Sequence, residues 1–116
     1  MVVDTLTAAQ TDRLFHALAD ATRRDIVART MRLEQSVSAL ARDYQMSFAA
    51  VQKHVAVLER ASLVTKERRG REQLVRGNAE TVRTAARLLD AYDAIWRERA
   101  AAIEDILAED GKETEQ

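Results

Sequence analysis

The stretch from Ser36 to Asn78 constrains the fold most, because it predicts two short helices and a two-stranded ribbon in direct succession. Ser36 is a suitable helix N-cap, and residues 37–44 place apolar side chains on one helical face. Gln45 and Met46 leave room only for a turn before a second cap, Ser47. Residues 36–60 therefore predict a helix-turn-helix unit, whose second helix can enter the major groove of DNA by its N-terminal end.

The second helix of this unit, residues 47–60, has two different sides. Val51, Val55 and Leu58 follow at i, i+4 and i+7, which predicts one buried stripe. The opposite side carries small and polar residues, namely Ala49, Ala50, Gln52, Lys53, Ala56 and Arg60. We expect this side to contact a DNA groove, with Gln52 and Lys53 as the principal contacts.

Three further residues of this helix leave alternatives open. Ser47 caps the helix, and its hydroxyl is also placed to reach a phosphate. His54 either donates to a phosphate or holds the turn in a purely structural role. Phe48 either contacts a thymine methyl or packs under the first helix of the unit, and packing is favoured.

Residues 63–77 predict a hairpin, which forms the wing of the motif. Residues 63–67 form the first strand and residues 74–76 the return, with Gly70 free to take a positive φ in the turn. Arg68, Arg69 and Arg71 surround that turn and suit a phosphate backbone or a minor groove, without discriminating bases. The alternative is an ordinary solvated hairpin end.

Charge is divided unevenly along the 116 residues, although the net charge is only −1. Residues 47–77 hold seven basic and three acidic residues, whereas residues 78–116 hold five basic and ten acidic residues. A polyanion would therefore bind at the second helix and the hairpin, and the C-terminal part would repel it. The length suggests one small domain spanning residues 1–116.

Two helices are expected before the helix-turn-helix unit. Thr7 and Gln10 form a candidate capping box for a helix that runs to about Ala19. Asp20 or Thr22 caps the next helix, whose inward positions are Ile26, Val27, Thr30 and Met31. Arg23 and Arg24 lie in its first turn, where the helix dipole disfavours cations, so they either have a role, such as a phosphate contact or an ion pair, or none.

A long helix over residues 79–108 follows the hairpin, and residues 109–116 are expected to form a polar, frayed tail. Apolar side chains recur along this helix with heptad spacing, interrupted only by Arg99. About thirty residues make a helix of ~45 Å, which exceeds what a small head can cover. We therefore expect a homodimer joined through the last and first helices, with interface residues Leu14, Leu89, Tyr92, Trp96, Ile103 and Ile106.

Several function classes are disfavoured. There are no cysteines, which excludes disulfides and thiolate metal sites, and only three glycines. No nucleophile–base combination, carboxylate pair or phosphate-binding loop stands out, so we expect no enzyme activity and no cofactor. The absence of a membrane span or a secretion signal predicts a cytoplasmic protein. A winged-helix module that binds proteins and not DNA is the alternative to a DNA-binding protein.

Residues 15–27, FHALADATRRDIV, resemble the opening signature of the ArsR-type winged helix-turn-helix repressors. Residues 46–59 look like their recognition helix, and Gly70-Arg71 looks like their wing turn. The resemblance implies a mainly α fold with a small β-hairpin wing and a homodimer formed through the first and last helices. It also implies a repressor that places two recognition helices in successive major grooves of a palindromic operator. By position, the implied DNA contacts are Ser47, Gln52, Lys53, His54, Arg68, Arg69 and Arg71.

The chain departs from the family pattern at three positions. Ala21 stands where the family usually has proline and Ser62 where it usually has glycine, and we expect little effect of either on the fold. Gln52 replaces a common serine, and glutamine can pair bidentately with adenine. The metal-sensing branches use cysteines, or His/Asp clusters on the last helix; here His16 and His54 both precede that helix, so we expect no metal site. The operator, the regulated genes, the direction of regulation and any small-molecule effector are left open.

Overall fold

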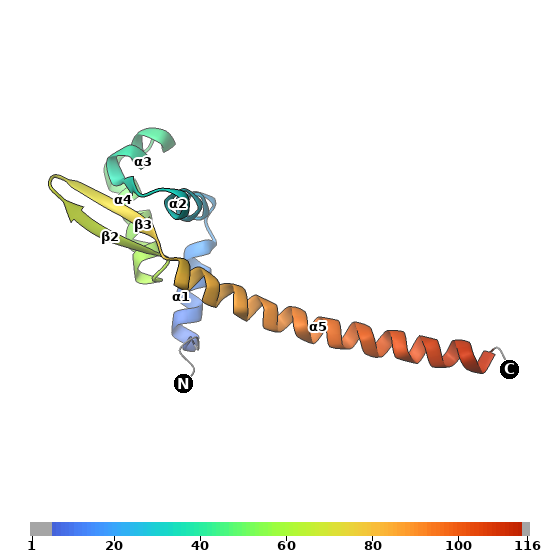
Figure 1. Ribbon diagram of the computed structural model, residues 1–116. Coiled ribbons are helices and arrows are strands. Elements are labelled where there is room, and N and C mark those ends of the chain that lie inside the picture. Colours follow the sequence, from blue (N-terminus) through green and yellow to red (C-terminus); the bar gives the residue numbers. More distant parts are fainter. Residues whose placement is uncertain (1–5, 115–116) are drawn as a thin grey trace. The chain divides into compact units, whose positions relative to one another are not determined.

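The computed structural model of the chain describes residues 6–114. Its helices are α1 (Ala8–Leu18), α2 (Ala21–Arg32), α3 (Val37–Tyr44), α4 (Phe48–Arg60) and α5 (Ala79–Thr114) (Figure 1). Its strands are β1 (Gln35–Ser36), β2 (Val64–Arg69) and β3 (Glu72–Gly77), which form an antiparallel sheet in the order β1-β3-β2. The predicted fold class, a helix-turn-helix with a hairpin wing, is confirmed. The two-residue strand β1 was not predicted.

The N-caps predicted from sequence are confirmed. Thr7 and Gln10 form a reciprocal capping box at the start of α1. The side chains of Asp20, Ser36 and Ser47 each accept a hydrogen bond from the backbone N–H three residues later, at 3.0, 3.0 and 3.1 Å. Each bond satisfies one of the donors that a helix N-terminus leaves without an intrahelical partner. The starts of α1 to α4 are therefore encoded locally.

Arg23 and Arg24 bond backbone carbonyls, a role that the sequence did not predict. Arg23 Nε donates to the Ala17 carbonyl and Arg24 Nη1 to the Leu18 carbonyl, both at 2.8 Å. These carbonyls belong to the last turn of α1, where helix acceptors lack intrahelical partners and the dipole favours cations. The two arginines therefore fix the corner between α1 and α2 through backbone acceptors.

The core lies among α1 to α4 and the sheet. The predicted stripe of Val51, Val55 and Leu58 is fully buried. Its buried neighbours from the other elements are Leu14, Ala17, Ile26, Val27, Val37, Leu40, Leu63, Val64 and Val75. Met31 is 39% exposed, so the prediction that it faces inward is wrong. Its backbone and side chain lie against the end of β3, where a Cβ on Gly77 would come within 2.5 Å of Met31 Sδ.

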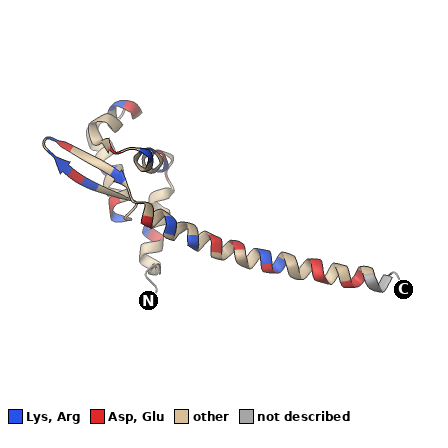
Figure 2. Cartoon of the chain, in the orientation of Figure 1, with Lys and Arg blue, Asp and Glu red and all other residues tan. Residues whose placement is uncertain are grey.

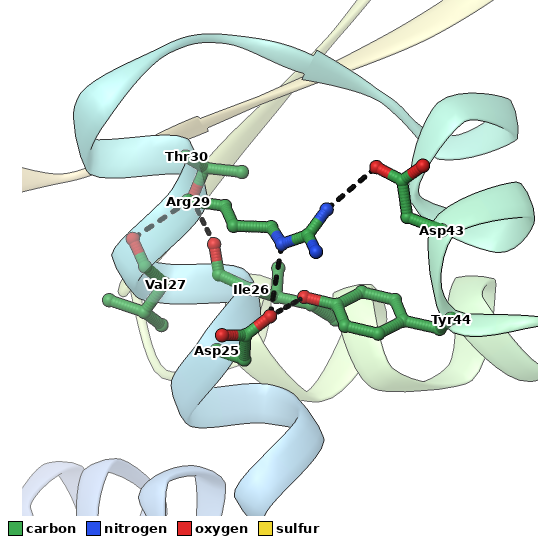
Figure 3. Close-up of polar contacts among 7 residues, drawn as sticks. All are labelled: Asp25, Ile26, Val27, Arg29, Thr30, Asp43 and Tyr44. Carbon is green, nitrogen blue, oxygen red and sulfur yellow. Dashed lines mark hydrogen bonds and ion pairs between the residues drawn. The ribbon is translucent and has the colours of Figure 1, made fainter.

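A polar cluster joins α2 to α3 on the outside of this core (Figure 3). Arg29 bonds Asp25 at 3.0 Å and Asp43 at 2.7 Å, and its guanidinium lies over the Tyr44 ring. The Tyr44 hydroxyl donates to Asp25. That bond lowers the pKa of Asp25, while burial together with Asp25 raises the pKa of Tyr44. The Asp43 carboxylate raises the pKa of Arg29.

The turn after α4 has an unfavourable backbone conformation for its residue type. Leu63 N–H donates to the Leu58 carbonyl at 3.0 Å and Ser62 N–H to the Glu59 carbonyl at 2.9 Å, which is a Schellman motif. The motif places its central residue in the left-handed region, and Ser62 has a φ of 61°. Glycine is favoured there because it has no Cβ. The fold is kept, but the serine makes this turn less stable.

The contacts divide the chain into two compact units, of which one ends at Thr84 and the other begins at Ala85. Within the second unit α5 continues to Thr114, so the prediction that the helix ends at Ala108 is wrong for the described residues. Residues 109–114 contain Glu, Lys and only one glycine, so their composition is compatible with a helix. The single-domain assignment stays a prediction. None of the helices in the described part of the chain combines the length and hydropathy that a membrane crossing requires.

Replacing Tyr44 with phenylalanine removes one hydrogen bond to a largely exposed carboxylate. We expect Tyr44→Phe to lower the free energy of unfolding by about 1 kcal/mol at neutral pH. Because the Asp25 pKa is depressed below 3.8, the bond stabilises the fold fully above that pH and progressively less as the pH falls through the lowered pKa. Urea unfolding of both proteins at pH 7 and at acid pH measures this difference. A deficit that grows on acidification contradicts the assignment.

Ser62→Gly relieves the left-handed strain at the end of α4. We expect the variant to be more stable by about 1 kcal/mol, after allowing for the greater freedom of glycine in the unfolded chain. Lys53→Gly, in the exposed middle of the same helix, is the matched control and should be less stable by roughly 0.5–1 kcal/mol. Thermal unfolding followed by circular dichroism gives both values. Equal destabilisation by the two glycines contradicts the role given to the turn.

Candidate nucleic-acid interface

The N-terminal half of α4 is open to solvent. Ser47, Ala49 and Lys53 are exposed, and Ala50 is half-buried. Phe48 is 48% exposed, so the favoured prediction that it packs under α3 is wrong and its ring is available to a ligand. The start of α4 therefore presents a small, mixed polar and apolar surface with one cation, as a helix that enters a groove requires.

The hairpin has an inner and an outer face, which its register defines. Lys66 pairs with Val75 and Arg68 with Gln73, so these residues share the face of the buried Val64 and Val75. On this inner face Lys66 Nζ lies 3.9 Å from Glu59 Oε1 of α4. Glu67 and Arg69 alternate with them and lie on the outer face. The inner face is therefore the one that packs along the recognition helix.

One hydrogen bond connects the inner face directly to a predicted base contact. Gln52 Nε2 donates to Gln73 Oε1 at 2.6 Å, and both side chains are partly buried. Gln52 is thus on the border between the open side of α4 and the hairpin, and one of its amide N–H groups is bonded to the wing. Gln73 was not among the predicted site residues. The alternation of β3 could have placed it on the face of Val75, but the sequence does not show which α4 residue it meets.

The adjacent wing arginines differ in what they contact. Arg69 Nη1 lies 3.3 Å from Glu34 Oε1 and its Nη2 lies 3.3 Å from Glu67 Oε2, on the outer face. Arg76 also bonds Glu34, at 2.6 Å. Arg68 makes only a 3.4 Å contact to the Gly70 carbonyl. Arg69 is therefore held by carboxylates of its own chain, whereas Arg68 keeps its charge on the side of α4.

The positive charge predicted for residues 47–77 is thus partly neutralised within the fold. Figure 2 shows acidic residues beside the basic ones on the hairpin. Among the described residues, Lys53 and Arg71 have no ion-pair or hydrogen-bond partner for their side chains, and Arg68 has no acidic one. These three cations remain near the start of α4 and the hairpin turn, where Gly70 has the predicted positive φ, 64°. They form the surface best suited to bind phosphates.

His54 has a structural environment. Its Nδ1 lies 3.9 Å from Asp20 Oδ2 and 3.4 Å from Arg23 Nη1, and its side chain is 22% exposed. Asp20 has a lowered pKa, chiefly because the Arg23 backbone N–H donates to it and further because His54 and the Arg23 side chain are near. His54 therefore connects α4 to the α1–α2 corner. Of its two predicted roles, this position favours the structural one over a phosphate contact.

The residues predicted for the dimer interface divide into two groups. On α5, considered by itself, Leu89, Tyr92, Trp96, Ile103 and Ile106 are all exposed, and so are Ile95 and Leu107. Leu14 is only 1% exposed, so the core of its own chain already covers it and it offers a partner no surface. Its neighbour Phe15 is 39% exposed. On α1, Phe15 and not Leu14 therefore has apolar surface open to a partner.

Two features bear on bound small molecules or ions. Within the described residues, no group of three or more His, Cys, Asp or Glu side chains lies close enough to hold a metal ion, and the absence of a metal site stays a prediction. A cavity of about 210 Å³ lies among α1, the end of α4 and the first residues of α5. Arg13, Arg60, Glu80 and Thr84 are among its lining residues. The effector left open by the sequence stays unidentified.

The chain is similar over most of its length to known regulators, although no family model matches it. It is 32% identical to the HTH-type transcriptional regulator Rv2034 of Mycobacterium tuberculosis. The 103 aligned residues cover 89% of this chain and 94% of that protein. The ArsR-like transcriptional regulator from Rhodococcus sp. RHA1 is 36% identical, with a TM-score of 0.73 over 84% of this chain and 92% of that one.

A third similar structure is the homodimeric winged helix-turn-helix DNA-binding domain of Mb0332 from Mycobacterium bovis. It is 26% identical, with a TM-score of 0.62 over 73% of this chain and 80% of that one. Each of these similarities extends over more than two thirds of the present chain. The chain therefore belongs to the ArsR family of winged helix-turn-helix transcriptional regulators.

Proposed function

We propose that this regulator is a homodimeric repressor that binds a palindromic operator through the start of α4 and the tip of the wing. The observation that carries the proposal is a group of three cations, Lys53, Arg68 and Arg71, beside the exposed start of α4, for which the described residues supply no acidic partner. Family membership supports it, and the Mb0332 domain is itself a homodimeric DNA-binding domain. A regulator of chromosomal DNA acts in the cytoplasm, and this is the location we propose.

The proposed contacts separate into those that position the protein and those that read bases. Arg68 and Arg71 bind the phosphate backbone next to the half-site, and Ser47 adds a hydroxyl at the helix N-terminus. Gln52, Lys53 and Phe48 enter the major groove with Ala49 and Ala50, whose small side chains let the helix approach the bases. Arg69 is left out of the contact surface because its charge is bound to Glu34 and Glu67.

The proposed dimer uses the exposed apolar side chains of α5 together with Phe15 of α1. Trp96 and Tyr92 are 60% and 59% exposed in the single chain, and large aromatic side chains dominate interface energetics. A row of such residues along one helix exposes far more contiguous apolar surface than the single apolar side chains that monomeric proteins commonly expose. Two copies joined in this way would present paired α4 helices to half-sites about one helical turn apart, ~34 Å.

Footprinting of the purified protein on the DNA upstream of its own coding region tests binding, symmetry and half-site spacing together. We expect two protected segments with inverted sequence symmetry, centred ~34 Å apart. Weak protection that is uniform along the fragment, even at low salt, contradicts the proposal and favours a module that binds proteins. Reporter expression with and without the protein distinguishes repression from activation.

Two neighbouring arginines provide a matched pair of variants on the operator so defined. We expect Arg68→Ala to weaken binding. The logarithm of the association constant falls as the logarithm of the salt concentration rises, and this fall should become less steep by about 1, because one phosphate contact is lost. Arg69→Ala, which faces the opposite side of the hairpin, should leave this slope unchanged. Fluorescence anisotropy at several salt concentrations measures both slopes. A smaller slope for Arg69→Ala, with no change for Arg68→Ala, means that the wing faces have been assigned the wrong way round.

The dimer is tested by two substitutions with opposite expected effects. Trp96→Ala should raise the dimer dissociation constant by at least ~10-fold, because a central aromatic anchor is lost. Arg99→Leu completes the apolar row that Arg99 interrupts and should lower that constant. Sedimentation equilibrium measures both against the chain mass of 13.0 kDa. Wild-type protein that sediments as single chains at micromolar concentration contradicts the dimer.

A further inference from the structure

The Gln52–Gln73 hydrogen bond joins the recognition helix to the wing at the position where a base would be read. Gln52 projects from the first half of α4, and Gln73 from the inner face of β3. The contact is 2.6 Å long, and both side chains are partly buried. Gln73 pairs with Arg68 of β2 and lies two residues before the fully buried Val75.

The bond leaves Gln52 with a defined set of hydrogen-bonding groups. A primary amide has two N–H donors and one carbonyl acceptor. Because one N–H of Gln52 is given to Gln73, one N–H and Oε1 remain. These are the groups that pair with N7 and the N6 amino group of adenine in the major groove.

Orientation matters as much as the number of groups. A free glutamine amide can turn about its last torsion and exchange the places of its oxygen and nitrogen. An exchanged amide presents donor and acceptor in the wrong order for the fixed edge of adenine, and can offer donors to the acceptors of other bases. In this structure Gln73 accepts from Nε2, which places the nitrogen of Gln52 toward the hairpin and its oxygen away from it.

We propose that Gln73 is a positioning residue for base recognition: it holds the Gln52 amide in the orientation that reads adenine. This inference rests on the proposed function, because it requires Gln52 to lie in the groove. It also connects the two parts of the interface, since Gln73 is the cross-strand partner of Arg68. The wing therefore takes part in base selection as well as in phosphate binding.

Affinities for the operator and for a set of single base-pair variants of each half-site test this inference. Wild-type protein should prefer A·T at one position per half-site, and Gln52→Ala should lose that preference. Gln73→Leu, which keeps a similar size but cannot accept a hydrogen bond, should reduce the preference about tenfold. Its affinity for operators that lack this A·T pair should stay within about twofold of wild type. The double variant should behave like Gln52→Ala alone, since both changes remove one interaction.

A conservative variant and a control separate positioning from a structural effect. Gln73→Glu keeps an acceptor for Gln52 Nε2, so the A·T preference should persist even where the added negative charge lowers overall affinity. Gln35→Leu makes the same chemical change in β1, on the same sheet, and should leave the preference unaltered. If Gln73→Leu does not fold, Gln73→Asn repeats the test, because its shorter side chain moves the amide out of reach of Gln52.

The outcomes distinguish this inference from the proposed function. If Gln52→Ala loses the A·T preference while Gln73→Leu retains it, the inference is wrong and the proposed function stands. If Gln73→Leu weakens binding equally to every operator variant, Gln73 is only structural and the inference is again wrong. If the wild-type protein shows no base preference at all, the proposed sequence-specific function fails first.

Discussion

The placement of β3 against α2 and α3 is the constraint on which the rest of the structure depends. Val75 is fully buried at its centre, and Gly77 brings its end so close to Met31 that a side chain could not be accommodated without movement. From this strand Gln73 reaches Gln52 of the recognition helix, and Arg76 reaches Glu34 before β1. Each of these contacts follows from the alternation of a strand whose inner face is buried. The wing is therefore an integral part of the fold formed by α1 to α4 and the sheet, and not an appended loop.

The distribution of ion pairs over the hairpin explains how a chain with a net charge of −1 can keep a positive surface. The carboxylates of Glu34, Glu67 and Glu59 neutralise Arg69, Arg76 and Lys66. Within the described part of the chain, Lys53, Arg68 and Arg71 form no ion pair with a carboxylate. Screening at physiological salt limits the reach of each charge to about 8 Å, so local arrangement matters more than the total.

Much of this fold could be predicted from the sequence because its signals are local. The caps at Asp20, Ser36 and Ser47 and the glycine turn at Gly70 each depend on residues within a few positions. The same holds for the buried stripe of α4, whose period belongs to one helix. The strand β1 was missed because two residues carry no periodicity. The end of α5 was misplaced because a polar composition suits a frayed tail and an exposed helix equally.

The site was predicted less completely, for a different reason. The sequence shows three arginines around the hairpin turn, but only the register shows that Arg68 and Arg69 face opposite sides. Phe48 and Leu14 were assigned incorrectly because an apolar residue at a helix start or in a first helix can face either way until the neighbours are placed. Gln73 was missed because its importance comes entirely from a partner 21 positions away.

The long helix has a further consequence for how the protein persists in a cell. From Leu89 onward every large apolar side chain among its described residues is exposed. A helix in water gains most of its stability from tertiary packing, so this segment by itself is marginal. In newly made chains that have not yet bound a second copy, this part of the helix would unfold often and become accessible to proteases. If the proposed dimer forms, the amount of regulator would set its own lifetime, because scarce chains would be degraded before they associate and abundant chains would protect each other.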